Sequence, residues 1–177
     1  NVGDIAGMGA DLYESYVGAI HAAAVLGFAY ADMKGLLFPF LLATIGLFAS
    51  IIGIVFVKTI ASRKNADPAN ALRNGTFLTS ILTAIGSFFL SKNLVGNLGP
   101  FWASIIGILD GIAIGLISEY YTSNKPIEKI AYASTTGPAT NIITGLSVGM
   151  ESTFLSIVAL AIGTYLSYLA NGMWGVA

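Results

Sequence analysis

The sequence contains no cysteine among its 177 residues, so disulfides and thiolate metal sites play no part in it. Charged side chains are also scarce, at 10% of the chain against about 25% in an ordinary soluble domain. The net charge of −1 gives no reason to expect a nucleic acid as a partner. Histidine occurs once, and the sequence has no P-loop, HExxH or nucleophile-elbow motif.

Hydrophobic residues are abundant, at 55% of the chain, and 21 residues are glycine, which lets helices approach closely in a membrane. No apolar segment alternates with the two-residue period of a barrel strand. Several segments are near the ~20 residues that a helix needs to cross a bilayer. We therefore predict an all-α, polytopic transmembrane helix bundle with about five spans, at about residues 5–30, 36–57, 75–90, 101–120 and 138–170.

Polar segments separate these spans, and their charges predict the orientation. Turns are expected at residues 31–35, 91–100 and 122–126, a polar loop at 58–73, and a break at the Gly137-Pro138 pair after an approach segment. Six of the eight basic residues fall in the two loops that share a side with the N-terminus, which predicts that this side is cytoplasmic. These six are Lys58, Arg63, Lys64, Arg73, Lys125 and Lys129, whereas Lys34 and Lys92 fall on the other side.

The first span carries an unusual row of ionisable side chains. On a helix with about 100° per residue, Asp4, Asp11, Glu14 and His21 lie within roughly 100° of one another. A charge near the bilayer centre costs at least ~2.5 kcal/mol, so such a row normally faces a polar cavity or an ion path. The alternative, a soluble helix with one wet face, conflicts with the apolar character of the rest of the chain.

Three blocks carry a resemblance to a known family. NVGDIAGMGADLYESYVGAI at 1–20 resembles the sixth transmembrane helix of membrane-bound, ion-translocating pyrophosphatases. GLISEYYTSNKPIEKIA at 115–131 is similar to the turn between helices nine and ten of that family, and STTGPATNIITGLSVGMEST at 134–153 to the segment that follows. The resemblance implies a single transmembrane portion, helices six to ten, of a homodimeric pump with about sixteen helices per subunit. We expect the 177 residues to be a piece of that protein, inactive by themselves.

The family implies hydrolysis of cytoplasmic pyrophosphate with Mg²⁺ as cofactor, K⁺ and Na⁺ as further activators, and outward transport of Na⁺ or H⁺. Asp4 matches a catalytic, magnesium-binding aspartate, whose other partners are absent from this chain. Asp11 matches the gate aspartate, and Glu14 matches the glutamate of sodium-pumping members, with Ser15 as a further oxygen ligand. Gly18 stands where plant proton pumps have that glutamate. We therefore expect Na⁺ as the transported ion, with H⁺ as the fallback.

The remaining polar residues are assigned supporting roles. Ser15 has an alternative interpretation as a hydroxyl bonded to its own helix. His21 is interpreted as an interhelical hydrogen-bonding residue or a group near the ion exit. Asp110 is interpreted as a partner for a polar group on a neighbouring helix, with a part in ion pumping as the alternative. Glu119 is expected to support the cytoplasmic end of its helix. A packing role is expected for Thr136, Thr140 and Asn141, and for Glu151 deeper in the last span.

Two functions are compatible with the acidic row. The first is a primary pump in a multi-pass membrane, expected to be a prokaryotic cell membrane, with the bilayer, pyrophosphate and the rest of the subunit as partners. The second is a secondary transporter or channel in which Asp11 and Glu14 bind a cation without hydrolysis. Asp4 discriminates between them, because a passive cation site does not require a hydrolytic carboxylate at the cytoplasmic end.

Overall fold

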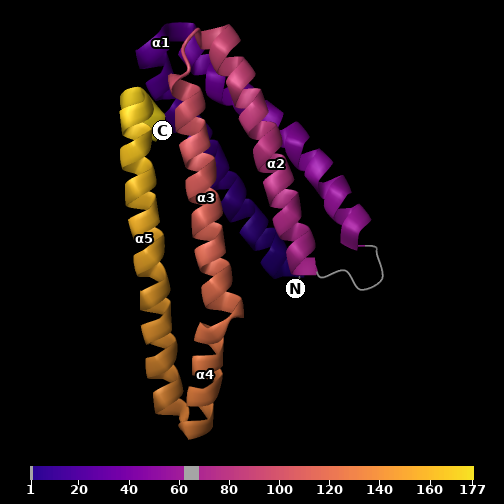
Figure 1. Ribbon diagram of the computed structural model, residues 1–177, viewed down its shortest axis with the longest axis vertical. Coiled ribbons are helices and arrows are strands. Elements are labelled where there is room, and N and C mark those ends of the chain that lie inside the picture. The colour runs from indigo at the N-terminus through magenta and orange to yellow at the C-terminus, as the bar shows by residue number, and fades with distance from the viewer. Residues whose placement is uncertain (1, 62–67) are drawn as a thin grey trace. The chain divides into compact units, whose positions relative to one another are not determined.

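The computed structural model describes residues 2–61 and 68–177, and every element in these ranges is a helix. Within these two ranges, four helices are long and apolar enough to cross a bilayer, which confirms the predicted all-α membrane bundle. The elements follow one another along the chain as drawn in Figure 1. They are α1 (Val2–Ala61), α2 (Pro68–Leu90), the π-helix η1 (Ser91–Val95), α3 (Gly99–Ser123), α4 (Lys125–Thr136) and α5 (Pro138–Val176).

Helix α1 contains two membrane-length segments. Its 60 residues would extend about 90 Å if straight, roughly three times the thickness of a bilayer core. Ala31 (φ −143°, ψ 29°) and Asp32 (φ 50°, ψ −138°) leave helical geometry and turn the chain back, as Figure 1 shows. Aspartate tolerates a positive φ better than most residues. The kink lies in the predicted 31–35 turn. Because the kink divides α1 into two spans, the predicted number of about five spans is close to that of the structure.

The second segment of α1 and helix α2 pack antiparallel through glycines. A Cβ at Gly86, Gly53 or Gly75 would collide with a branched side chain of the facing helix. The partners of these three glycines are Ile45, Thr79 and Val57, respectively. In these three contacts the α1 residue advances from Ile45 through Gly53 to Val57, while the α2 residue goes back from Gly86 through Thr79 to Gly75. This is the register of an antiparallel helix pair. The backbones approach closely because each glycine accepts a branched side chain.

The connection between these two helices is shorter than predicted. Lys58 belongs to the last turn of α1, and α2 begins at Pro68, so Arg73 is already helical. Proline is favourable in the first turn, where its missing N–H costs no hydrogen bond. The predicted loop residues Arg63, Lys64 and Asp67 lie outside the described residues.

The predicted turn at 91–100 is also mostly helical. The chain continues from α2 as the π-helix η1, which ends where Gly96 adopts φ 76° and donates its N–H to the Ser91 carbonyl at 2.9 Å. Glycine adopts this left-handed conformation without a steric penalty. Asn97 then accepts the N–H of Gly99 through its side-chain oxygen at 2.9 Å, and α3 begins. The non-helical part of this connection is therefore shorter than the sequence suggested.

The chain forms two compact units, the first made of Asn1–Ser104 with Tyr168–Ala177 and the second of Ile105–Ser167. In the first unit, the Trp174 ring packs against Phe38 at 5.7 Å and Tyr30 at 6.4 Å between ring centroids. A kink at Asn171 and Gly172, which the sequence did not predict, brings this end of α5 to the kink of α1. The last helical stretch predicted from the sequence therefore ends in a packed turn.

In the second unit, the rest of α3 and α5 are joined through α4. Helix α4 ends at Thr136, Gly137 adopts φ 142°, and α5 begins at Pro138. The hydroxyls of Thr136 and Thr140 lie 2.6 Å apart across this break, and Thr140 also donates to the Gly137 carbonyl at 2.8 Å. These two threonines therefore satisfy backbone groups at the helix break, as well as contributing to packing.

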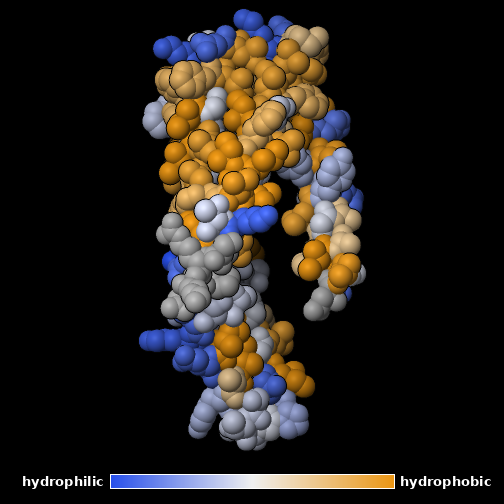
Figure 2. Space-filling model, turned by 90° about the vertical axis from the view of Figure 1, so that its right-hand side faces the viewer, coloured by the Kyte–Doolittle hydropathy of each residue, from blue (hydrophilic) through white to orange (hydrophobic). Residues whose placement is uncertain are grey.

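Most of the hydrophobic surface remains exposed. At most 11% of the most apolar window of each membrane-length helix is buried inside the structure. Figure 2 shows hydrophobic side chains over a broad area of one face. An exposed apolar area of this extent is typical of a surface that meets lipid or further helices. The multi-pass membrane character of the chain follows from its apolar helices and their length.

Candidate functional site

The acidic row lies along the first segment of α1. Asp4 is in the first turn, and Asp11, Glu14 and His21 follow on the same helix, all four with exposed side chains. With a rise of about 1.5 Å per residue, Asp11 lies about 10 Å beyond Asp4 along the axis, and Glu14 about 4.5 Å beyond Asp11. Asp11 and Glu14 are three residues apart and can therefore reach one shared ion. Ser15 is exposed on the next position.

The face that packs within the chain is opposite to this row. Tyr16 donates its hydroxyl to the Ala43 carbonyl at 3.4 Å, a long hydrogen bond to the second segment of α1. Gly27 is buried where the two segments of α1 approach each other at Gly35. Tyr16 and Gly27 both lie about 170° around the helix from the centre of the acidic row. The chain's own packing therefore leaves Asp11, Glu14 and His21 exposed.

The register of the helices places Asp4 at a defined end of the first unit. Tyr16 lies beside Ala43 and Gly27 beside Gly35, so the two segments of α1 run antiparallel and Asp4 lies near the level of Lys58. The Gly75–Val57 contact brings the start of α2, with Arg73, to the same end (Figure 1). The kink of α1 with Lys34 and the π-helix with Lys92 are at the other end. In the first unit, Lys58 and Arg73 thus lie at one end and Lys34 and Lys92 at the other.

The acidic row does not form a metal cluster by itself. Among residues 2–61 and 68–177, no three His, Cys, Asp or Glu side chains come close enough to hold a metal ion together. The spacing of the row explains this, because Asp4 and Asp11 are separated by two turns of helix. Mg²⁺ is commonly bound through one or two carboxylates plus substrate phosphates, and Asp4 can provide one such carboxylate.

The two acids predicted in the fourth span have different surroundings. Asp110 is half-buried in α3, and its carboxylate lies against the backbone of Gly163 in α5, where a Cβ would come within 2.5 Å of Oδ2. The structure thus brings Asp110 to a neighbouring helix at a glycine, and its pairing with a polar group stays a prediction. Glu119 is half-buried nearer the C-terminal end of the same helix.

One polar pair was missed by sequence reasoning. The Tyr121 hydroxyl donates to Glu151 Oε1 at 3.2 Å, linking α3 to α5 in the second unit. Tyr121 is 7% exposed, whereas Tyr120, beside it in the sequence, is 46% exposed. The two tyrosines look equivalent in the sequence, and Glu151 follows 30 residues later. Only the fold therefore distinguishes the tyrosine that binds the acid.

Comparison with known proteins shows that the chain is similar to about a quarter of the length of proteins named pyrophosphate-energized pumps. The family model described as inorganic H⁺ pyrophosphatase matches residues 1–177. A protein of Clostridium tetani, provisionally named a K⁺-stimulated pyrophosphate-energized sodium pump, is 47% identical over 171 residues, 95% of this chain and 25% of that protein. A K⁺-insensitive pyrophosphate-energized proton pump of Caldanaerobacter subterraneus is 41% identical over 188 residues, 98% of this chain and 26% of that protein.

A third relative, the K⁺-stimulated pyrophosphate-energized sodium pump of Thermotoga maritima, is 34% identical over 203 residues, 96% of this chain and 28% of that protein. Sodium pumps and proton pumps therefore both occur among the similar proteins. The chain spans about a quarter of the length of these curated relatives.

Proposed function

The chain belongs to the inorganic H⁺ pyrophosphatase family, and we propose that it forms the transmembrane portion of a primary ion pump driven by pyrophosphate hydrolysis. The observation that carries this proposal is the row of exposed carboxylates along one face of α1. Its carboxylates begin at one end of the bundle with Asp4 and continue into the membrane with Asp11 and Glu14. A pump needs a reaction site at one end of such a row and an ion site further along it.

Asp4 is proposed to act in hydrolysis. The substrate is pyrophosphate, and Mg²⁺ supplies the positive charge that neutralises its phosphate oxygens. Asp4 fits this role as a hard oxygen ligand at the end of the helix, and further ligands must come from other parts of the complete protein. There, Asp4 helps to position the attacking water and to hold its proton. No covalent intermediate with the protein is required.

Asp11 and Glu14, with Ser15, are proposed as the ion gate. Two carboxylates three residues apart repel each other unless a cation or proton lies between them. Na⁺ is the proposed cargo, because Glu14 is at the position expected of sodium-pumping members and Gly18 has no carboxylate to replace it. His21 is proposed to give polar support further along the row, and Asp110 and Glu119 to support the α3–α5 region. H⁺ remains the alternative cargo, since relatives of both kinds are similar.

The setting of this portion is a multi-pass membrane protein. We propose that the other helices of the same subunit cover the acidic row and that two subunits form a homodimer in a prokaryotic cell membrane. Support comes from the chain's packing, which uses the face of α1 opposite to the acids. A secondary transporter without hydrolysis would also need Asp11 and Glu14. It would give no reason for Asp4 at the end of the row.

The test is substitution of Asp4 in the full-length, detergent-purified pump. Asp4→Asn keeps the size of the side chain and removes its charge, so magnesium-dependent release of phosphate from pyrophosphate should fall at least about 100-fold, in the range typical for loss of one transition-state interaction. The matched control is Asp32→Asn at the kink, where Asn also tolerates a positive φ and turnover should be retained. Near-normal turnover in Asp4→Asn protein would contradict the proposal.

A further inference from the structure

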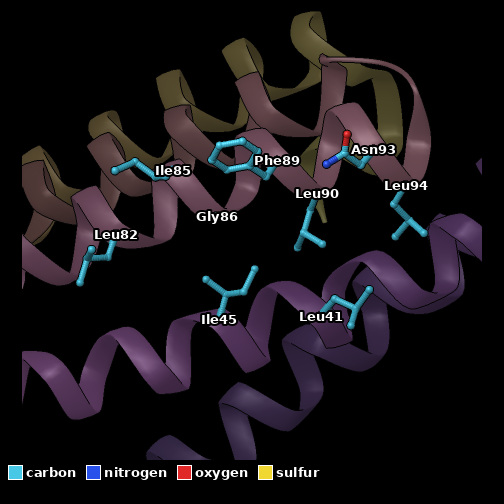
Figure 3. A pocket seen from close by; sticks show the side chains of 9 residues that line it. All are labelled: Leu41, Ile45, Leu82, Ile85, Gly86, Phe89, Leu90, Asn93 and Leu94. Carbon is cyan, nitrogen blue, oxygen red and sulfur yellow. The ribbon is translucent and has the colours of Figure 1, made fainter.

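A pocket of about 550 Å³ lies between the second segment of α1 and helix α2 with η1. Figure 3 shows Leu90 and Leu94 reaching toward Ile45 and Leu41 of α1, while Ile85 and Phe89 follow each other along α2. Leu82 and Gly86 complete the apolar lining, and Asn93 is its polar residue. The volume lies in the range of sites that hold small molecules. All of these residues belong to the first unit.

The α2 side of this pocket is open to the surroundings of the chain. Ile85 is 51% and Phe89 57% exposed, although both lie in a helix of membrane-spanning length. An apolar molecule that reaches this open side can therefore enter the pocket between the two helices. The polar Asn93 lies near the end of this pocket, beyond the last turn of α2. The lining is therefore apolar except for Asn93.

A positive charge lies on the same face as the apolar lining. On a regular helix, Leu41 and Ile45 both lie within about 20° of Lys34. Lys34 is exposed and begins the second segment of α1, about 10 Å along the axis from Leu41. Asp32 precedes it in the kink, before helical geometry resumes. A lysine near a helix end extends its ammonium group toward the membrane interface.

We propose that this pocket binds one anionic phospholipid, with an acyl chain between α1 and α2 and the phosphate near Lys34 and Asn93. The apolar lining matches a hydrocarbon chain, and the cation and the amide match a negatively charged phosphate with ester oxygens. The separation of about two helical turns between Lys34 and Leu41 leaves space for the glycerol part of the lipid. This site lies at the end of the bundle opposite to Asp4 and is independent of the proposed hydrolysis.

The charge of the headgroup can be tested with the full-length pump in detergent. The probe is phosphatidylglycerol that carries a photoreactive diazirine in its acyl chain, followed by mass spectrometric mapping of the cross-linked peptides. We expect cross-links on the stretch that contains Ile85 and Phe89 and competition by unlabelled phosphatidylglycerol, but not by phosphatidylcholine. Lys34→Gln should reduce this cross-linking several-fold. Lys92→Gln is the matched control. Lys92 lies at the same end of the bundle, but its ammonium group is over the ring of Phe88, which does not line the pocket, whereas Lys34 shares the helix face of the lining residues of α1.

A second pair of variants tests the pocket itself. Ile85→Trp places a large side chain at the open side and should reduce the phosphatidylglycerol cross-links, whereas Ile81→Trp, 58% exposed on α2 and outside the lining, should not. Absence of cross-links in the unmodified pump would mean that another helix covers the pocket and would overturn the proposal. Equal cross-linking with phosphatidylcholine, or an unchanged result in Lys34→Gln, would show only general lipid contact and would also overturn it.

Discussion

At the scale of single residues, the environment of a carboxylate decides its role. Asp4 lies at a helix end, Asp11 and Glu14 lie along an open helix face, and Asp110 lies against the backbone of Gly163. A charge within the membrane is costly unless it meets an ion, a proton or a polar cavity. The exposed Asp11 and Glu14 therefore need an ion, a proton or a polar group from outside the described packing, whereas Asp110 already contacts a neighbouring helix.

Glu14 provides the sharpest residue-level prediction about the transported ion. In the full-length pump, Glu14→Ala should raise the Na⁺ concentration for half-maximal activation of hydrolysis about tenfold or more, equivalent to about 1.4 kcal/mol of Na⁺ binding. The KM for magnesium pyrophosphate should change much less, because Asp4 is about 15 Å away along the helix. The measurement is the hydrolysis rate as a function of Na⁺ concentration.

The control for this change is Glu128→Ala, which removes an exposed acid at the start of α4, away from the acidic row. That variant should keep the Na⁺ dependence of the unmodified pump. If Glu14→Ala protein showed the same Na⁺ dependence as the control, Glu14 would not be a sodium ligand. Hydrolysis that is independent of Na⁺ in the unmodified pump would favour H⁺ as the cargo.

The Tyr121–Glu151 hydrogen bond leads to a stability prediction. Tyr121→Phe removes only the hydroxyl and should lower the stability of the full-length pump by about 1 kcal/mol, the usual net value for one hydrogen bond. Tyr120→Phe is the matched control, since Tyr120 is exposed and its loss of a hydroxyl should change little. Thermal unfolding in detergent measures both. Equal melting temperatures for the two variants would show that this bond does not stabilise α3 against α5.

At the scale of elements, hydrophobic length and glycine patterns explain most of what the sequence could predict. Long apolar runs predicted the all-α membrane class, and the short polar stretch at residues 31–35 coincides with the kink of α1. The sequence could not predict η1, because its residues differ from an ordinary helix only in how their carbonyls pair. The sequence also did not predict the kink at Asn171 and Gly172. Gly172 lies beside Tyr30 and Asn171 beside Gly99, and these residues are far apart in the sequence.

The glycine contacts between α1 and α2 make a testable element-level claim. Gly53→Val would push against the methyl group of Thr79 and should destabilise the helix pair by about 1–3 kcal/mol, as overpacking generally does. Gly46→Val is the matched control, because a Cβ at Gly46 meets no atom within 4 Å and the helix-propensity cost is the same. Thermal unfolding of the full-length variants in detergent gives the comparison. A larger loss for Gly46→Val would contradict this antiparallel packing.

At the scale of the whole molecule, the exposed acidic face of α1 explains why the complete site could not be predicted from this chain. Resemblance to a family suggested roles for the acids before any fold was known, and the fold adds that these acids lie opposite to the face that packs within the chain. The complete site could not be predicted, because a magnesium–pyrophosphate site needs several carboxylates and the described residues do not bring three together. The chain spans about a quarter of the length of these relatives.

The most direct test of the pump is transport by inside-out vesicles that contain the full-length protein. Addition of magnesium pyrophosphate should drive ²²Na⁺ uptake, and a protonophore should leave this uptake intact because hydrolysis itself supplies the energy. Asp4→Asn vesicles are the control and should take up no ²²Na⁺ above background. Uptake that requires an imposed proton gradient, and that pyrophosphate does not support, would contradict the account and indicate a secondary transporter.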